Sequence, residues 1–279
     1  YEYITNKGIL KIIDSQNSFD ENGIITSGTG KIYHDENSIV SGDLGRNASL
    51  IVNYGTLDIS GGLLESANIG NVIGLASGTV TLNSGNIVGY NLLDGNFNMN
   101  GGKVDVDNII LYNATINSGT INSQNILGNT IDILGGTINS SKVSGPTINA
   151  IGGTVNGTIT EFTTLNVGTK DDVVSTEIPS ITSVVSEYVR SDGVNMVGTF
   201  NFYDGKIGSI SGRINEVQPG YRVVSSDGYN ILTPIGEDER VAMVNGINFT
   251  SLQAAINSVK DNTESNIVIY KNIELTEDI

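Results

Sequence analysis

The chain has 279 residues, a formal net charge of −16, no cysteine and a single histidine. This charge disfavours nucleic acids and anionic membrane surfaces as partners, because phosphate recognition needs a concentrated basic patch. The composition also excludes disulfides, thiolate catalysis and cysteine-based metal sites, and no apolar run is long enough to predict a transmembrane helix.

The first segment, residues 1–172, is predicted to consist of stacked β-coils. Gly-Gly or Ser-Gly pairs recur in it with a period of about 17 residues, which indicates a repeat architecture. These pairs end at Gly85, Gly102, Gly119, Gly136 and Gly153. The start of the segment is less regular, because Gly8–Ile13 and Gly30–Tyr33 look like coils with longer loops. The same motif at Gly55–Gly62 stands further from Gly85 than one period, which predicts a six-residue insertion in that coil.

Apolar residues follow the same period in four columns, which we expect to face a common interior. The columns are Val80, Phe97, Ala114, Ile131, Ile148 and Leu165; then Leu82, Met99, Ile116, Ile133, Ala150 and Val167; then Ile87, Val104, Ile121, Ile138 and Val155; and finally Leu92, Ile109, Ile126 and Val143.

The spacing inside one period favours short strands joined by bends. A two-residue step places both side chains on one face of a strand, whereas the five-residue steps break that alternation. A helix would need apolar residues three and four apart and better helix formers, and a left-handed hexapeptide helix would repeat every six residues. The sequence therefore predicts an all-β, right-handed parallel β-helix with about 17 residues per coil in its centre.

The next two segments are predicted to interrupt and then close this stack. Residues 173–197 are interpreted as an excursion that replaces roughly one coil. Within it, Ile181, Val184, Val185, Tyr188 and Val189 have the spacing of a short helix packed on the solenoid. Residues 198–235 are expected to form the final coils and the closing strands, with turn residues between Gln218 and Ile235 that favour irregular strands capping the stack.

Residues 236–279 are predicted to begin a second β-helix unit. Val241–Phe249 reads as a hairpin with an Asn-Gly turn. Thr250–Gln253 has the pattern of a capping box, which predicts a short helix that would serve as a cap for the solenoid. Ile267–Tyr270 and Ile273–Leu275 read as strands.

Parts of the chain resemble a known family. Val244–Ile256, followed by Ile267–Ile279, resembles the opening of pectin-lyase-like right-handed β-helix domains of Gram-positive bacterial surface proteins. Ile4–Asp14 and Gly55–Gly62 look like middle coils of that family, and Gly220–Val224 looks like its closing coil. The resemblance implies a β-helix, an extracellular or cell-surface location and tandem arrays, and it implies no common reaction.

Acidic residues are the natural candidates for chemistry on polysaccharides, which needs converging carboxylates. Asp105 and Asp107 share an outward strand face, but one coil later their neighbours are Asn122 and Gln124, so no carboxylate stack is expected. Asp171 with Asp172, and Glu237–Glu239, are expected to be solvated loop charges. We therefore predict no catalytic residue and a protein that is not an enzyme.

Metal and cofactor sites are not predicted either. The calcium-binding repeat and the EF-hand loop are both missing from the sequence, and His34 is one histidine in a loop. Tyr90 and Tyr112 would favour a carbohydrate- or receptor-binding module if they formed an exposed aromatic platform.

Polar outward columns suggest a structural role. One column reads Thr81, Asn98, Thr115, Asp132, Asn149 and Asn166, and its neighbour reads Thr79, Asn96, Asn113, Thr130, Thr147 and Thr164. Stacked Asn and Thr side chains can form hydrogen bonds along the stack. The sequence thus favours a structural or adhesive surface solenoid. A polysaccharide-active enzyme and a glycan- or receptor-binding module are the alternatives.

The two ends of the sequence suggest how such a solenoid associates. The sequence begins inside a coil at Tyr1–Thr5 and stops inside another at Ile273–Ile279. Open coil edges invite another strand, so we expect head-to-tail association of copies, or tandem units within a longer chain. Nucleic acid and membrane insertion are not expected.

Overall fold

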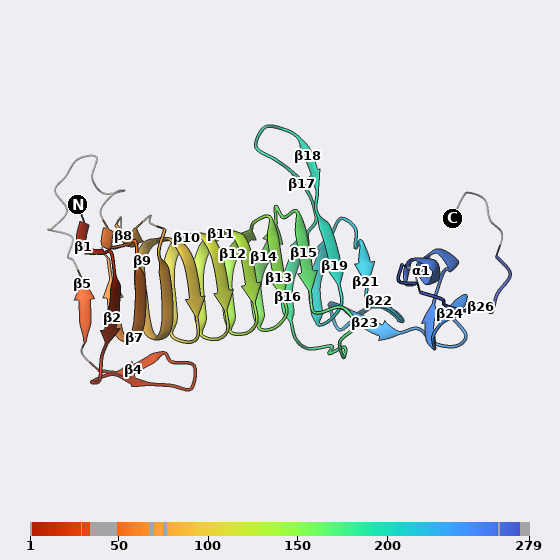
Figure 1. The fold of residues 1–279 in the computed structure, drawn as a ribbon, viewed down its shortest axis with the longest axis horizontal. Coiled ribbons are helices and arrows are strands. Elements are labelled where there is room, and N and C mark those ends of the chain that lie inside the picture. Colours follow the sequence, from red (N-terminus) through yellow and green to blue (C-terminus); the bar gives the residue numbers. More distant parts are fainter. Residues whose placement is uncertain are drawn as a thin grey trace.

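The chain forms a parallel β-solenoid followed by a small mixed unit, as Figure 1 shows. The computed structural model describes residues 2–28, 30–33, 49–66, 70–74, 77–261 and 263–273. The first coils contain β1 (Glu2–Asn6), β2 (Ile9–Ile13), β5 (Lys31–Tyr33), β6 (Ser49–Asn53), β7 (Thr56–Glu65) and β8 (Asn71–Gly74). The regular coils contain β9 (Thr79–Met99), β10 (Lys103–Ile116), β11 (Thr120–Ile133), β12 (Thr137–Ser144), β13 (Thr147–Ala150), β14 (Thr154–Thr160) and β15 (Thr164–Val167).

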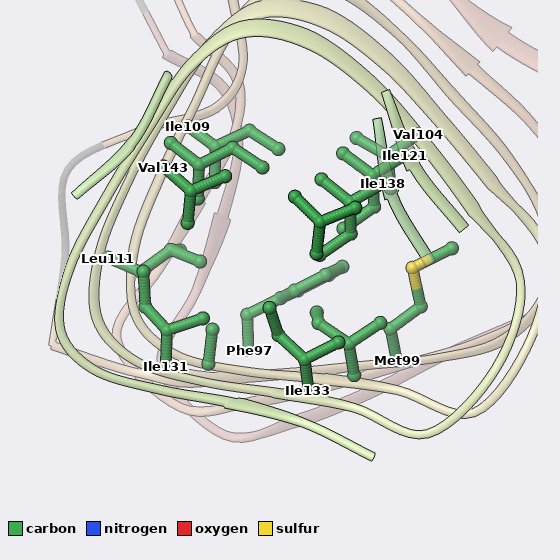
Figure 2. Close-up of a cluster of buried hydrophobic side chains, with 14 of the residues drawn as sticks. Phe97, Met99, Val104, Ile109, Leu111, Ile121, Ile131, Ile133, Ile138 and Val143 are labelled. Atoms are coloured by element: carbon green, nitrogen blue, oxygen red, sulfur yellow. The ribbon is translucent and has the colours of Figure 1, made fainter. Parts of the chain in front are cut away.

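The 17-residue period is the hydrogen-bonding register of the central strands. Val104 pairs with Ile121 and Ile116 pairs with Ile133, each in parallel register, and the same shift relates β9 to β10. Every member of the four predicted apolar columns is buried, and none is more than 4% exposed. Figure 2 shows members of all four columns, among them Ile131, Ile133, Ile138 and Val143, pointing from the walls of the coil into one shared interior. The prediction that the four columns face one common interior is confirmed.

The looser first coils also follow the predicted register. Leu57 pairs with Val80 and Ile59 pairs with Leu82, so the insertion before Gly85 adds length without disturbing the interior. Leu10 and Ile32 pack against the same core, as expected for coils that begin at Gly8 and Gly30.

The repeated glycines form one corner of the coil. Gly119 has φ +90°, and a Cβ atom placed on it would lie 2.5 Å from the carbonyl oxygen of Gly102. Successive coils therefore approach each other here more closely than any side chain allows. The corner glycines with positive φ are Gly62, Gly85, Gly102, Gly119, Gly136, Gly153 and Gly205, which we call the glycine row.

The predicted helix between Ile181 and Val189 is wrong. Residues 180–185 form strand β16 (Ser180–Val185), which pairs with β14 and with β20 (Lys206–Ser211) inside the solenoid. Ile181 and Val184 are both buried, three residues apart, because the strand turns the corner of the coil at this point. The same three-residue step recurs between Ile207 and Ile210, so it reflects a bend in the coil and not helical periodicity.

Residues 173–197 accordingly do not replace a coil. Leu165 pairs with Phe200 across a single coil that is lengthened at two places, before and after β16. The second insertion is an antiparallel hairpin of β17 (Glu187–Val189) and β18 (Asn195–Val197), and it projects from the solenoid in Figure 1. The coil then continues through β19 (Thr199–Phe202) and β21 (Glu216–Val217), inside the segment 198–235 that is predicted to form the final coils.

The stack is closed by the strands predicted between Gln218 and Ile235. β22 (Tyr221–Ser226) and β23 (Tyr229–Pro234) form an antiparallel pair, and β23 also pairs antiparallel with β20. Leu232 is buried against the solenoid core. The antiparallel pairing ends the run of parallel coils.

The last unit is a small sheet with one helix. β24 (Ala242–Val244) lies between β25 (Ile247–Phe249) and β26 (Ile267–Ile269), and the predicted Asn-Gly hairpin turn joins β24 to β25. Helix α1 (Leu252–Asn257) packs Ala255 on this sheet. Its N-cap is Ser251, one residue after the position that the capping-box pattern predicts. Residues 274–279 lie outside the described residues, so they do not test the last predicted strand.

Candidate functional site

The outward face of β7 and β9–β11 is hollowed by a shallow groove where these strands bend. The groove has a volume of about 410 Å³. It is lined by Glu65, Ser66, Val88, Gly89, Tyr90, Asp105, Val106, Asp107, Asn122, Ser123 and Gln124. Both aspartates that sequence reasoning singled out therefore lie in it, with Tyr90. We call it the acidic groove.

Glu65 is the acidic residue of this groove that the sequence analysis does not identify. It pairs with Val88, which in turn pairs with Asp105, so Glu65 lies two coils before Asp105 in the same outward column. At about 4.8 Å per coil, the two residues are roughly 10 Å apart along the axis. The step that relates Leu57 to Val80 also relates Glu65 to Val88, so the insertion length would have revealed this neighbour.

Lysines neutralise two of the three carboxylates in the acidic groove. Lys103 Nζ lies 2.8 Å from Asp105 Oδ2, and Lys31 forms an ion pair with Glu65. Asp105 also accepts a hydrogen bond of 3.4 Å from Asn122 Nδ2. Within the described ranges, no three acidic or histidine side chains converge in a way that could hold a metal ion. The groove itself offers polar side chains and one aromatic ring to a ligand, and the two lysines lie beside it.

Asparagine side chains form hydrogen-bonded ladders along the outside of the coils. In each step an Nδ2 donates to the Oδ1 or the carboxylate of the residue in the preceding coil. The ladders run Asn71, Asn91, Asn108, Asn125; Asn83, Asn100, Asn117; Asp105, Asn122, Asn139, Asn156; and Asp132, Asn149, Asn166, Asn201. Asn113 donates to Asn96 in the same way, at 2.9 Å.

Two of these ladders start at an aspartate, and the direction of the hydrogen bonds explains why. Asp132 accepts a hydrogen bond of 2.8 Å from Asn149, and Asp105 accepts from Asn122. A carboxylate accepts hydrogen bonds but has no proton to donate to the preceding coil, so it fits only at the accepting end of a ladder. The two aspartates thus serve the stacking of the coils.

The other acidic candidates lie in surface contacts. Gln218 bridges Asp171 and Asp172 through their backbone atoms, at 3.0 and 2.8 Å. Glu239 accepts a 3.0 Å hydrogen bond from Arg222 Nε, which holds the pKa of that carboxyl below its ordinary value. Tyr112 is 63% exposed on β10. His34 lies outside the described residues.

One further polar cluster was not visible in the sequence. Tyr203 donates a hydrogen bond of 2.7 Å to Glu216, which also binds Lys170. Burial, reinforced by the hydrogen bond to Glu216, raises the pKa of the Tyr203 hydroxyl well above its ordinary value. Through Glu216 and Lys170, the cluster connects β21 to the loop that follows β15.

Comparison with family models, curated proteins and solved structures gives no match for this chain. The fold therefore rests on the register and burial described above. No helix among the described residues has the length and apolar character needed to cross a membrane.

Proposed function

We propose that this chain is a non-enzymatic structural or adhesive β-solenoid that forms or presents an extended extracellular rod. The observation that carries the proposal is the shared 17-residue register of the interior and the exterior. The apolar columns bind the coils from inside, and the asparagine ladders bind them from outside. Side chains on the inside and on the outside of the solenoid thus both hold each coil against the next. A stiff rod requires such contacts along its whole length.

The sequence resemblance supports the location of this rod. Pectin-lyase-like domains of Gram-positive surface proteins are extracellular and share an architecture more than a reaction. The absence of cysteine suits a rod that is stabilised without disulfides. A host glycan or receptor would be the ligand of an adhesive rod, and the net charge of −16 argues against nucleic acid.

The first coil is suited to end-to-end association. β1 pairs only with β6, and β2 and β5 pair only with β7, among the described strands. Ile9 and Ile13 on β2 are 76% and 71% exposed. Exposed strand edges with apolar side chains recruit further strands. The neighbour would be a second copy, or the preceding unit of a longer tandem chain.

We expect purified chains to form rods that lengthen with concentration. Electron microscopy should show particles longer than one solenoid, and Ile9→Lys together with Ile13→Lys should shorten them, because a charged edge strand resists pairing. Ile110→Lys is the matched control, since Ile110 is 43% exposed but lies on β10, away from the open edge. Uniform short particles at high concentration would exclude self-assembly and leave tandem linkage as the source of the rod.

A polysaccharide-binding or polysaccharide-active groove is the second candidate function. Glu65, Asp105 and Asp107 lie in one groove with Tyr90, and Lys103 contacts Asp105. Three acids, a lysine and an aromatic ring on the outside of a β-solenoid are the combination that would favour this alternative.

Under the structural proposal, the chain should release neither unsaturated nor reducing ends from polygalacturonate, alginate or glucans, with or without calcium. The assay should include Asp107→Asn, because the described residues offer Asp107 no ion-pair partner. Asp58→Asn, on an outward position of β7, is the control. Turnover that Asp107→Asn abolishes and Asp58→Asn preserves would establish the enzymatic alternative.

A further inference from the structure

Two hairpins that are far apart in the sequence have the same tip. The first joins β3 (Ser18–Phe19) to β4 (Ile25–Ser27), and the second joins β17 to β18. In the first tip Gly23 N donates to Asp20 O at 3.1 Å, and in the second Gly193 N donates to Arg190 O at 2.8 Å. Both glycines have positive φ, +76° and +83°. The two tips therefore present their backbone carbonyls in the same way.

The first hairpin places its tip on the glycine row. Gly102 N donates to Asn22 O at 2.6 Å, and Gly85 N donates to Gly23 O at 2.9 Å. One coil earlier, Gly62 N donates to Asn17 Oδ1 at 2.8 Å. The hairpin thus satisfies three successive N–H groups of the row.

The glycine row continues beyond this tip, where the described part of the chain offers its next three N–H groups no acceptor. No described residue accepts a hydrogen bond from the N–H of Gly119, Gly136 or Gly153. The next position of the row is Pro179, which has no N–H, and Gly205 beyond it donates to Ser175 O at 2.9 Å. The three N–H groups without a described acceptor therefore lie between the first hairpin and Pro179. Buried backbone N–H groups in proteins normally have a hydrogen-bond acceptor.

A groove of about 430 Å³ lies over these three glycines, and we call it the glycine groove. It is lined by Asn22, Gly119, Thr120, Leu134, Gly135, Gly136, Thr137, Gly152, Gly153, Thr154 and Ile178, none of which is charged. Leu134 is 44% exposed and Ile178 is 52% exposed. One coil beyond Leu134, Ile151 is 43% exposed, whereas the same outward column is asparagine at Asn100 and Asn117. The column is thus apolar in the coils of Gly136 and Gly153, which the first hairpin does not cover.

The second hairpin has the properties of an occupant for the glycine groove. Val189, Val194 and Val197 are 64%, 46% and 57% exposed. No described residue donates a hydrogen bond to the tip carbonyls of Asp192 and Gly193, the counterparts of Asn22 and Gly23. Arg190 pairs with Asp192, so the tip carries no net charge into an uncharged groove.

A hairpin of the same chain does not reach this groove. In Figure 1, β17 and β18 project from one side of the solenoid, and β4 runs along the opposite side. The glycine groove continues the path of the β3–β4 tip, because Asn22 forms part of its lining. A β17–β18 hairpin that occupies this groove therefore has to come from another molecule.

We propose that the β17–β18 hairpin of a second copy docks in the glycine groove. The carbonyls of Asp192 and Gly193 accept hydrogen bonds from two of the three free N–H groups, as Asn22 and Gly23 do on the neighbouring part of the row. The exposed valines cover Leu134 and Ile151. This contact joins solenoids side to side, so it is independent of the end-to-end contact proposed above.

Disulfide trapping tests the contact directly, because the chain contains no cysteine. One preparation carries Ser191→Cys at the hairpin tip and another carries Thr137→Cys in the glycine groove. Mixed under mild oxidation, they should yield a covalent heterodimer on a non-reducing gel. Thr130→Cys, on another outward face of β11, replaces Thr137→Cys in the control mixture. Equal trapping of Thr137→Cys and Thr130→Cys would overturn the proposal, and circular dichroism checks that each variant is folded.

Sedimentation gives a second readout that does not depend on cysteine. Leu134→Lys with Ile151→Lys should weaken the side-to-side association about tenfold or more, because two charges would be buried against the valines. Leu127→Lys, 46% exposed on β11 outside the groove lining, should leave it unchanged. End-to-end contacts do not bring residue 191 near residue 137, so trapping distinguishes the two modes. Trapping without rods would leave this proposal standing while the self-assembly proposal failed.

Discussion

Replacing Ile133 by aspartate is expected to lower the free energy of unfolding by about 3–5 kcal/mol, because the carboxylate would be buried without a partner. Ile133 is fully buried, and its neighbours in the column are Ile116 and Ala150, which offer neither a cation nor a donor side chain. An aspartate in this position has no route to solvent, since the coil surrounds it (Figure 2) and the next coils cover it above and below.

Thr130→Asp is the matched control for Ile133→Asp. Thr130 lies on the same strand but faces outward, between Asn113 and Thr147 of the adjacent coils. We expect this change to alter stability by less than about 0.5 kcal/mol, the usual range for a surface position. Urea unfolding of both variants measures the difference. Equal losses would mean that the inward and outward sets are wrongly assigned.

Replacing Gly119 by alanine is expected to lower the free energy of unfolding by more than about 3 kcal/mol, because a conformational cost and a steric clash add up there. A non-glycine residue with positive φ costs about 1–2 kcal/mol by itself. At Gly119 the new Cβ atom would also lie 2.5 Å from the carbonyl oxygen of Gly102, which belongs to the backbone of the preceding coil and cannot move alone. The coils would have to separate locally, and Thr120 N would lose part of its 3.0 Å hydrogen bond to Gly102 O.

Gly193→Ala separates these two contributions. Gly193 has φ +83°, close to the +90° of Gly119, but a Cβ atom placed on it meets nothing within 4 Å. Only the conformational cost applies there, so we expect a loss of at most about 2 kcal/mol. Thermal unfolding of the two alanine variants gives the comparison. Similar losses would show that close packing of the coils contributes little at the glycine corner.

Residue spacing is sufficient to establish the solenoid and its interior. A two-residue step fixes which side chains share a strand face, and a constant period fixes which residues stack, so both follow from the order of residues alone. This is why the sequence correctly assigns columns such as Val104, Ile121 and Ile138 to the core. Turn residues, which also act locally, predict the closing strands and the hairpin at Asn245.

Local spacing was misleading where a coil turns a corner. Ile181 and Val184 are three residues apart, which is a helical spacing, but here it spans a bend in β16. Only pairing with β14 and β20 shows this, because a bent strand and a helical turn can present the same apolar pattern.

The covering of the outside of the solenoid follows only from contacts between distant segments. The groove between Glu65 and Asp105 is seen only in the structure, although the insertion length places Glu65 in the same outward column as Asp105. Likewise, the carbonyl of Asn22 meets the N–H of Gly102 although several coils of sequence separate them. Repeats determine contacts between neighbouring coils, whereas a hairpin that leaves the coil is free to lie on any face until packing and hydrogen bonding select one.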